Sequence, residues 1–101
     1  MLVEIQVLPD PTGTAGARYH HINAAIARLA ASELRYEVGA LGTTIEGAPD
    51  VLWPLIRAAH QATLESGADQ VVTIIKVAQS ATDDNALTID RLTRSHRTTE
   101  T

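Results

Sequence analysis

The stretch LRYEVGALGTTIE, residues 34–46, decides the fold of this 101-residue chain. Residues 34–40 alternate between apolar and polar side chains, and residues 43–46 are rich in β-branched side chains, so each part predicts a strand. Leu41 and Gly42 leave room only for a tight connection between them, which indicates a hairpin. A hairpin in the middle of the chain limits how the segments on either side can be arranged.

On each side of this hairpin the sequence predicts one helix and one strand. Before it, residues 2–8 alternate as a half-buried strand that Pro9 is expected to end, and apolar residues at helical spacing predict a helix over residues 17–32. After it, a helix is predicted over residues 51–66, with Asp50 as its cap and Gly67 as its terminator. Residues 70–77, QVVTIIKV, form a near-continuous apolar run, which predicts a strand inside the sheet and covered on both faces.

The predicted order is therefore strand, helix, strand, strand, helix, strand. Because strand–helix–strand crossovers are right-handed, both helices are expected on one face of a four-stranded antiparallel sheet. The predicted fold class is α+β, a ferredoxin-like βαββαβ sandwich formed by residues 1–78. Residues 79–101 are predicted to be a polar loop, a short C-terminal element around Leu87, Ile89 and Leu92, and a frayed tail.

Composition and charge argue against several classes of partner. The net charge is −4, whereas binding to nucleic acid phosphates needs clustered Lys and Arg. The chain has no cysteine, which excludes disulfides, zinc–thiolate sites and cysteine nucleophiles. No apolar run is long enough to span a bilayer and no signal peptide pattern is present, so we expect no membrane partner and a cytoplasmic location.

The sequence predicts no metal site, no cofactor and no catalytic residue. His20 and His21 are adjacent, and on a helix they point about 100° apart, so they cannot readily hold one metal ion. Neither a phosphate-binding loop nor a nucleophile elbow is present. These observations favour a binding protein over an enzyme.

The segment GTTIEG, residues 42–47, followed by Asp50 and then by Ala59-His60, resembles the signature of the small thiamine-binding protein family. Val7-Leu8-Pro9, Tyr19 and Ile75-Lys76-Val77 extend the resemblance over residues 2–77, in the family's order and spacing. The resemblance implies a ferredoxin-like fold, assembly into dimers or tetramers, and binding of thiamine or its hydroxymethylpyrimidine moiety.

Two departures from the family pattern bear on the ligand. Members of the family commonly place an acidic residue and soon an Arg after the last strand, where this chain has Ala78-Gln79-Ser80-Ala81. Their frequent His-Glu pair in the second helix is His60-Gln61 here. If the missing charged groups orient the ligand, affinity or specificity differs in this chain.

An aminopyrimidine presents a donor–acceptor edge, which calls for a carboxylate, a hydroxyl or amide, and an apolar surface for the ring. Glu46 can supply the carboxylate, and Gly47 lets a ligand approach the backbone closely. Each candidate also has a structural alternative: Glu46 as a solvated strand-end charge, Tyr19 as a core residue, Lys76 as an ion-pair partner of Glu4 or Glu37, and His60 as a packing residue. The candidate ligand-binding residues are Glu46, Thr43, Thr44, Gly47, Tyr19, Lys76 and His60.

The predicted function is that of a homo-oligomeric binding protein for thiamine or hydroxymethylpyrimidine. The sheet face away from the helices is expected to be covered by another subunit, in a dimer or tetramer whose interface also forms ligand pockets. One alternative is a small ferredoxin-like enzyme, of isomerase or cofactor-free oxygenase type, which would use His60 or Glu46 in a cleft. Another is an assembly or regulatory module that binds no small ligand.

Overall fold

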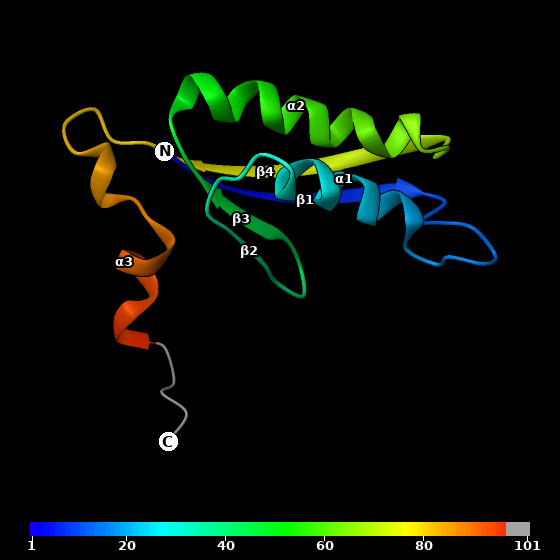
Figure 1. Ribbon diagram of the computed structural model, residues 1–101, viewed down its shortest axis with the longest axis horizontal. Helices are drawn as coiled ribbons and strands as arrows, with labels where there is room; N and C mark the ends of the chain where they lie inside the picture. The colour runs from blue at the N-terminus through cyan, green and yellow to red at the C-terminus, as the bar shows by residue number, and fades with distance from the viewer. Residues whose placement is uncertain (97–101) are drawn as a thin grey trace.

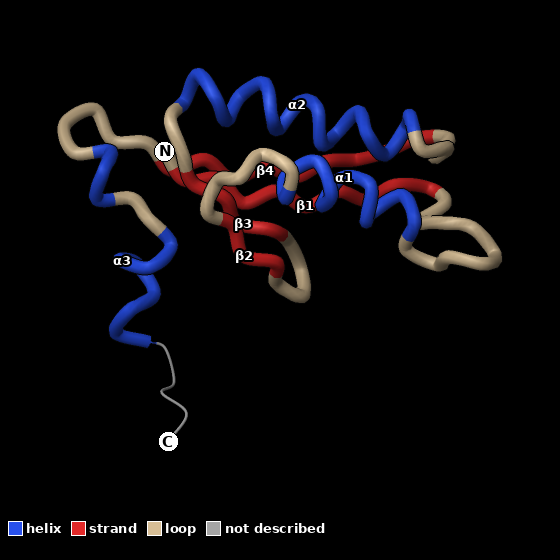
Figure 2. The backbone as a smooth tube through the Cα atoms, in the orientation of Figure 1, coloured by secondary structure: helices blue, strands red, loops and turns tan. Residues whose placement is uncertain are grey.

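The computed structural model describes residues 1–96, which form one four-stranded antiparallel sheet with helices (Figure 1). The strands are β1 (Leu2–Asp10), β2 (Tyr36–Val38), β3 (Thr43–Glu46) and β4 (Gln70–Ala78), in the order β2-β3-β1-β4. Figures 1 and 2 show α1 (His20–Ala30) and α2 (Pro49–Glu65) side by side on one face of the sheet. The predicted ferredoxin-like α+β fold is confirmed.

The core lies between this face of the sheet and the two helices. Val3 of β1 pairs with Ile45 of β3, and both are fully buried because antiparallel partners point to the same face. Leu29 of α1 and Leu52 of α2 close over them. We call the opposite side of the sheet, which neither α1 nor α2 covers, the open face.

The first strand is longer than predicted. Pro9 does not end it: β1 continues to Asp10, with Pro9 opposite Val71 and Asp10 opposite Gln70 of β4. On its other side, β1 pairs with β3 only from Leu2 to Ile5. Beyond Ile5 one side of β1 has no partner strand, so a proline without an N–H is tolerated there.

The helix α1 is shorter than predicted and begins three residues later. Tyr19 is its N-cap, with backbone angles outside the helical region, and 53% of the residue is exposed, so the core alternative for Tyr19 is wrong. The buried stripe of α1 consists of His21, Ala25 and Leu29, at i, i+4 and i+8.

The helix α2 starts at Pro49, and Ala48 is its N-cap, so the prediction that Asp50 caps it is wrong. Asp50 still lies in the first turn, where a negative charge is favourable. Pro54 is the sixth helical residue and lies on the exposed side, where water can satisfy the carbonyl left free by its missing N–H. Gly67, with φ +122°, terminates this segment as predicted.

The predicted interior position of the last strand is wrong. Within the described chain β4 pairs only with β1, so it is an edge strand. Its apolar residues stay exposed on both faces, with Val72 60% exposed on the open face and Ile75 and Val77 each 40% exposed on the helix face. Burial within one copy of this chain therefore does not explain the apolar run.

We call residues 79–96 the C-terminal arm. It contains the 3₁₀-helix Asp84–Ala86, the helix α3 (Ile89–Thr93) and the 3₁₀-helix Arg94–His96, and its Ile89 is buried. Thr88 caps α3 by accepting a hydrogen bond from the Arg91 N–H. Most of the predicted frayed tail, residues 97–101, lies outside the described residues. Of the helices formed by residues 1–96, none has the length and apolar character needed to cross a membrane.

Candidate functional site

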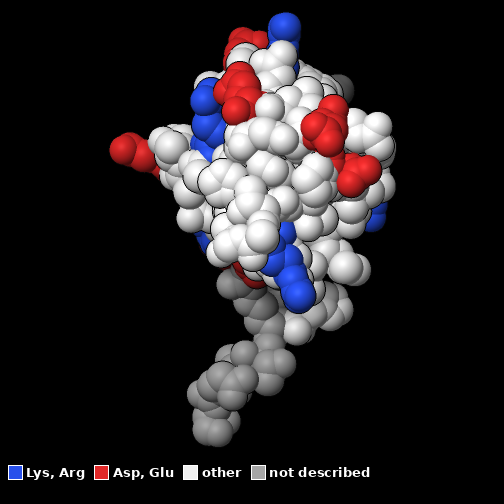
Figure 3. Space-filling model, turned by 90° about the vertical axis from the view of Figure 1, so that its right-hand side faces the viewer, with Lys and Arg blue, Asp and Glu red and all other residues white. Residues whose placement is uncertain are grey.

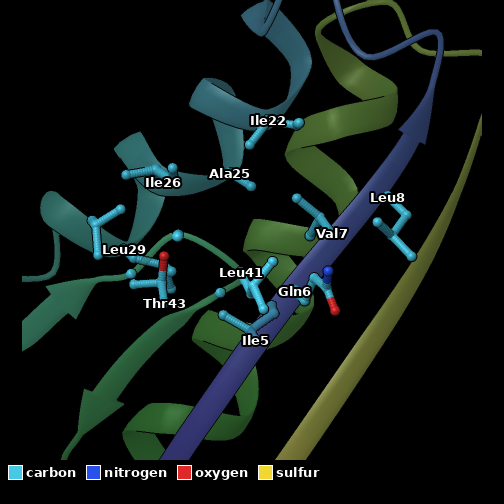
Figure 4. A pocket seen from close by; sticks show the side chains of 14 residues that line it. Ile5, Gln6, Val7, Leu8, Ile22, Ala25, Ile26, Leu29, Leu41 and Thr43 are labelled. Atoms are coloured by element: carbon cyan, nitrogen blue, oxygen red, sulfur yellow. The ribbon is translucent and has the colours of Figure 1, made fainter.

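An apolar cavity of about 180 Å³ lies between α1, β1 and the loop that joins β2 to β3 (Figure 4). It exists because β3 stops pairing with β1 at Ile5, and the hairpin then diverges from β1 beneath α1. Figure 4 shows α1 side chains opposite those of β1, with Leu41 and Thr43 of the hairpin between them. The walls include Ile22, Ile26 and Leu29 of α1, Ile5 and Val7 of β1, and Val38, Leu41 and Thr43 of the hairpin.

The lining of this cavity carries no charge on any described residue. Its two polar side chains are Gln6, which alternation places on the open face of β1, and Thr43, which alternation places on the helix face of β3. Thr43 is only 3% exposed. Peptide groups of the loop between β2 and β3 also line the cavity. In this loop the Gly39 N–H donates to the Gly42 carbonyl at 2.8 Å. A bound molecule would meet apolar walls, one hydroxyl and the loop backbone.

Thr44 and Lys76, two further candidates, lie on the open face. The Lys76 Nζ is 3.6 Å from the Glu4 Oε1, so Lys76 forms one of the ion pairs expected as its structural alternative. The Lys76 side chain is 79% exposed, and an ion pair in this setting contributes little stability. Thr44 pairs with Glu4 across the two strands, which puts these three side chains together.

Glu46 and Gly47 hold the two ends of the described chain together. The Glu46 Oε1 accepts a hydrogen bond from the Ile89 N–H of the C-terminal arm at 2.9 Å. The Gly47 N–H donates to the Met1 carbonyl at 3.1 Å, and the Met1 amine donates to the Gly47 carbonyl at 3.0 Å. A Cβ at Gly47 would lie 3.1 Å from the Leu34 Cδ1, so glycine fits here for reasons of packing.

The Met1 amine also forms an ion pair with Asp84 of the C-terminal arm, at 2.6 Å. This hydrogen bond, together with one from the Ser80 N–H, lowers the pKa of the Asp84 carboxyl below its usual range. On the outer side of the arm, Arg35 donates to Asp90 at 2.9 Å, and this bond raises the pKa of the Arg35 guanidinium. The arm is thus attached to three separate segments of the body.

Tyr19 and His60 lie away from the cavity, from the open face and from the contacts of the C-terminal arm. Tyr19 is at the start of α1, and the His60 Nδ1 lies 2.5 Å from the Thr73 Oγ1, between α2 and β4. The structure therefore divides the seven candidates among four kinds of place. Thr43 lines the cavity, Thr44 and Lys76 lie on the open face, Glu46 and Gly47 contact the C-terminal arm and Met1, and Tyr19 and His60 stand apart. The structure does not bring them into one site, and only Thr43 lines the cavity.

Sequence reasoning missed the cavity walls of α1. Ile22 and Ile26 belong to the apolar residues whose spacing predicted this helix, and that spacing does not distinguish a cavity wall from a core residue. The structure buries the neighbouring stripe instead, which leaves these two side chains at the cavity.

A second hollow, of about 530 Å³, lies on the other side of the same loop. It is bounded by the open face and the C-terminal arm, with Leu2, Thr44 and Leu92 in its lining together with the carboxylates of Glu4 and Glu37. Residues 39–42 border both spaces. Among residues 1–96 no three His, Cys, Asp or Glu side chains gather in a way that could hold a metal ion.

Charges are spread over the end of the molecule shown in Figure 3. Lys and Arg side chains lie apart from one another there, among Asp, Glu and broad uncharged areas. This face of the described chain carries no continuous basic surface of the kind that binds nucleic acid.

The antiparallel ferredoxin-like sheet, with two helices on one face and an uncharged cavity beneath the first, defines a small α+β domain. The sequence model of one family, described as thiamine-binding protein, matches residues 3–97. The chain belongs to this family, as the GTTIEG resemblance indicated.

Relatives and solved structures support the assignment. A UPF0045 protein of Methanothermobacter thermautotrophicus is 33% identical over 88 residues, which cover 85% of this chain and 89% of the relative. A solved domain of unknown function, DUF77, from Bacillus cereus has a TM-score of 0.83 and 33% identity, covering 95% of this chain and 88% of its own. A Thermotoga maritima structure named for thiamine biosynthesis or salvage has a TM-score of 0.77 over 95% of this chain and 97% of its own; at 24% identity it supports the fold alone.

Proposed function

We propose that this protein binds the pyrimidine moiety of thiamine, as free hydroxymethylpyrimidine or as part of thiamine, in the cavity beneath α1. The observation that carries the proposal is an uncharged apolar cavity with the Thr43 hydroxyl in its wall, in a chain of the thiamine-binding family. A flat heteroaromatic ring is held by apolar walls and oriented by a few polar groups. The Thr43 hydroxyl and the loop peptides supply both donors and acceptors for the ring nitrogens and the amino group.

The size and charge of the cavity favour the pyrimidine over larger forms of the vitamin. A volume of about 180 Å³ holds about six water molecules at roughly 30 Å³ each, which is room for one substituted ring. A thiazolium cation or a phosphate would meet no opposite charge in the lining, and burying an unpaired charge is costly. These groups are therefore placed outside, at the mouth formed by Leu41, which is 80% exposed.

The other candidate residues enter the proposal through self-association. Leu8, Val72 and Ile74 expose apolar surface on the open face, beside Thr44 and Lys76. We propose that a second copy covers this face in a dimer or tetramer. Thr44 and Lys76 would then reach a ligand only at that interface, and the ligand roles of Glu46, Gly47, Tyr19 and His60 remain predictions.

The proposed role is binding, in carriage, buffering or sensing of the vitamin, without catalysis. The two groups that the enzyme alternative would use support this choice. Glu46 is engaged by the Ile89 amide and His60 by the Thr73 hydroxyl, and they belong to different parts of the structure. Neither side chain is among those that line the cavity.

Calorimetric titration with hydroxymethylpyrimidine and with thiamine tests the proposal. Thr43→Val removes one hydroxyl at constant shape, and loss of one hydrogen bond worth about 0.5–1.5 kcal/mol predicts binding roughly two- to tenfold weaker. Ile26→Trp should fill the cavity and abolish binding. Thr44→Val is the matched control, because it makes the same change on the opposite face of the same strand.

Pyrimidine binding that is unaltered in both Thr43→Val and Ile26→Trp would exclude the cavity as the site. If Thr44→Val weakens binding instead, the ligand lies on the open face. Failure of the wild-type protein to bind either compound would overturn the proposed function as a whole.

A further inference from the structure

We propose that the free edge of β1 at Val7 recognises the amino edge of the bound pyrimidine, through the N–H and the C=O of Val7. These two backbone groups hold the ring in one orientation, as a partner strand would, and select 4-aminopyrimidines over their 4-oxo analogues. The inference rests on the proposed function and adds to it the groups that decide which ring is bound.

The backbone groups of every second residue of β1 point toward β3. The Gly47 N–H, just beyond β3, donates to the Met1 carbonyl at 3.1 Å, so these two residues form a hydrogen-bonded pair. In an antiparallel ladder such pairs recur at every second residue, and Ile5 therefore exchanges its bonds with Thr43. Val7 is the next residue of this set, so its N–H and C=O point to the same edge.

The partner strand ends before Val7. β3 pairs with β1 only from Leu2 to Ile5, and the residue that would face Val7 in the same register, Leu41, is 80% exposed at the tip of the hairpin. Within residues 1–96 no hydrogen bond engages the N–H or the C=O of Val7 on this side. The half-buried Val7 thus has a donor and an acceptor open to another molecule.

The cavity beneath α1 reaches this edge. Successive residues of a strand point to opposite faces, yet Ile5, Gln6, Val7 and Leu8 all line the cavity (Figure 4). One space meets side chains of both faces where it extends around the edge of a strand. Since β4 pairs along the other edge of β1, this is the edge on the β3 side. A ring in the cavity can therefore contact the Val7 backbone.

Pro9 lies on the same edge and shows what is special about Val7. It is two residues further along β1, so its backbone nitrogen points the same way, and it is buried. Because proline carries no N–H, no donor is left without a partner at that position. Val7 keeps its N–H where the edge faces the cavity. A donor retained there calls for an acceptor from a ligand or from water.

The amino edge of a pyrimidine is complementary to these backbone groups. A ring nitrogen beside an exocyclic amino group is an acceptor next to a donor, whereas an extended residue presents a donor N–H and an acceptor C=O on one edge. A 4-oxo pyrimidine whose ring nitrogen carries a hydrogen reverses both roles. The Thr43 hydroxyl can rotate to donate or to accept, so it tolerates either ring. The Val7 backbone cannot reverse its groups and therefore supplies the selectivity.

Calorimetric titration with hydroxymethylpyrimidine and with its 4-oxo analogue tests this selectivity. The analogue loses two hydrogen bonds, so we expect it to bind more weakly by about tenfold or more. Equal binding of the two rings by the wild-type protein would overturn the inference and leave the proposed function in place. Binding of neither ring would overturn the proposed function, and the inference with it.

Val7→Pro removes the donor itself. Pro9 shows that this edge of β1 accepts proline, and the pairing with β4 is kept because the lost N–H points away from β4. We expect this variant to bind hydroxymethylpyrimidine about two- to tenfold more weakly than Val7→Ala. Val7→Ala is the matched control, since it also loses the branched side chain but keeps the N–H. Equal binding by the two folded variants would overturn the inference.

Hydrogen exchange gives a measurement that needs no variant, and it decides if Val7→Pro fails to fold. In the free protein the Val7 amide should exchange faster than the amides of Gln6 and Leu8, which point toward β4, and bound hydroxymethylpyrimidine should slow it. A Val7 amide that is as protected as these neighbours without ligand would contradict the free edge. Exchange at Val7 that the bound pyrimidine leaves unchanged would also overturn the inference.

Discussion

At the level of single residues, a buried histidine joins the two helices. The His21 Nδ1 lies 2.7 Å from the Ser66 Oγ, and His21 is 3% exposed. The Ser66 hydroxyl donates its one hydrogen to the Thr63 carbonyl at 2.9 Å, so it accepts from His21, and Nδ1 is the nitrogen that carries the hydrogen. The bond fixes the start of α1 against the end of α2.

We expect Ser66→Ala to destabilise the protein by about 1–3 kcal/mol, because it leaves the buried Nδ1–H without an acceptor. The free energy of unfolding, from urea denaturation, measures this. Ser95→Ala, at an exposed position in the C-terminal arm, is the control and should stay within about 0.5 kcal/mol of wild type. Equal stability of the two variants would show that the His21–Ser66 bond contributes nothing.

At the level of elements, the C-terminal arm depends on polar contacts made by Asp84, Ile89 and Asp90 with the body. The only one of these residues that is buried is Ile89. With so little apolar burial, attachment of the arm is sensitive to the charge state of its carboxylates.

Asp84 therefore makes the attachment depend on pH. Its pKa is lowered in the folded protein, so its contribution is fully present above the ordinary Asp pKa of about 4 and is lost as pH falls through the lowered value. We expect the Ile89 amide resonance to shift toward a detached state in that acidic window. Asp84→Asn should show a weaker attachment at neutral pH and lose the part of the pH dependence due to Asp84. Identical profiles for the two proteins would contradict this role.

Most elements could be predicted from the sequence because each follows its own local pattern. The β-branched run Thr43–Glu46 is a strand with the predicted bounds, and the helix predicted over residues 51–66 is α2, Pro49–Glu65. The position of β4 in the sheet could not be predicted from its apolar run, since burial by its own chain and burial by a partner leave the same pattern. The continuation of β1 through Pro9 depends on where β3 ends, which no local signal records.

The candidate site was less predictable than the fold. Thr43 was among the candidates and lines the cavity, but Glu46 and Gly47 were chosen for their chemistry and they anchor the arm. Ile22 and Ile26 were not among the candidates and counted only toward the helical spacing of the first helix. A cavity wall and a core residue have the same apolar character, so periodicity cannot separate them before the packing is known.

At the level of the whole molecule, the open face of the sheet leaves apolar side chains exposed. A domain of about 100 residues buries only about 60–70% of the surface that its unfolded chain exposes, so its stability is marginal. Leu8, Val72 and Ile74 expose further apolar surface on the open face. Association that covers the open face would add directly to the stability of the fold.

The melting temperature is therefore expected to rise with protein concentration, by several degrees between about 1 and 100 µM, because association stabilises only the folded chain. Differential scanning fluorimetry with an external dye measures it. Ile74→Lys, which puts a charge on the open face, should melt at the same temperature at both concentrations. A wild-type melting temperature that does not change over this range would argue for a folded monomer.

Trp53, the chain's single tryptophan, is an intrinsic fluorescent probe on α2. It is half exposed on α2, and it does not line the cavity beneath α1. Its emission should stay unchanged when a pyrimidine enters the cavity, and also when a second copy covers the open face, because α2 lies on the other side of the sheet. Unlabelled protein can therefore report a change in the surroundings of α2 as an event separate from ligand occupancy.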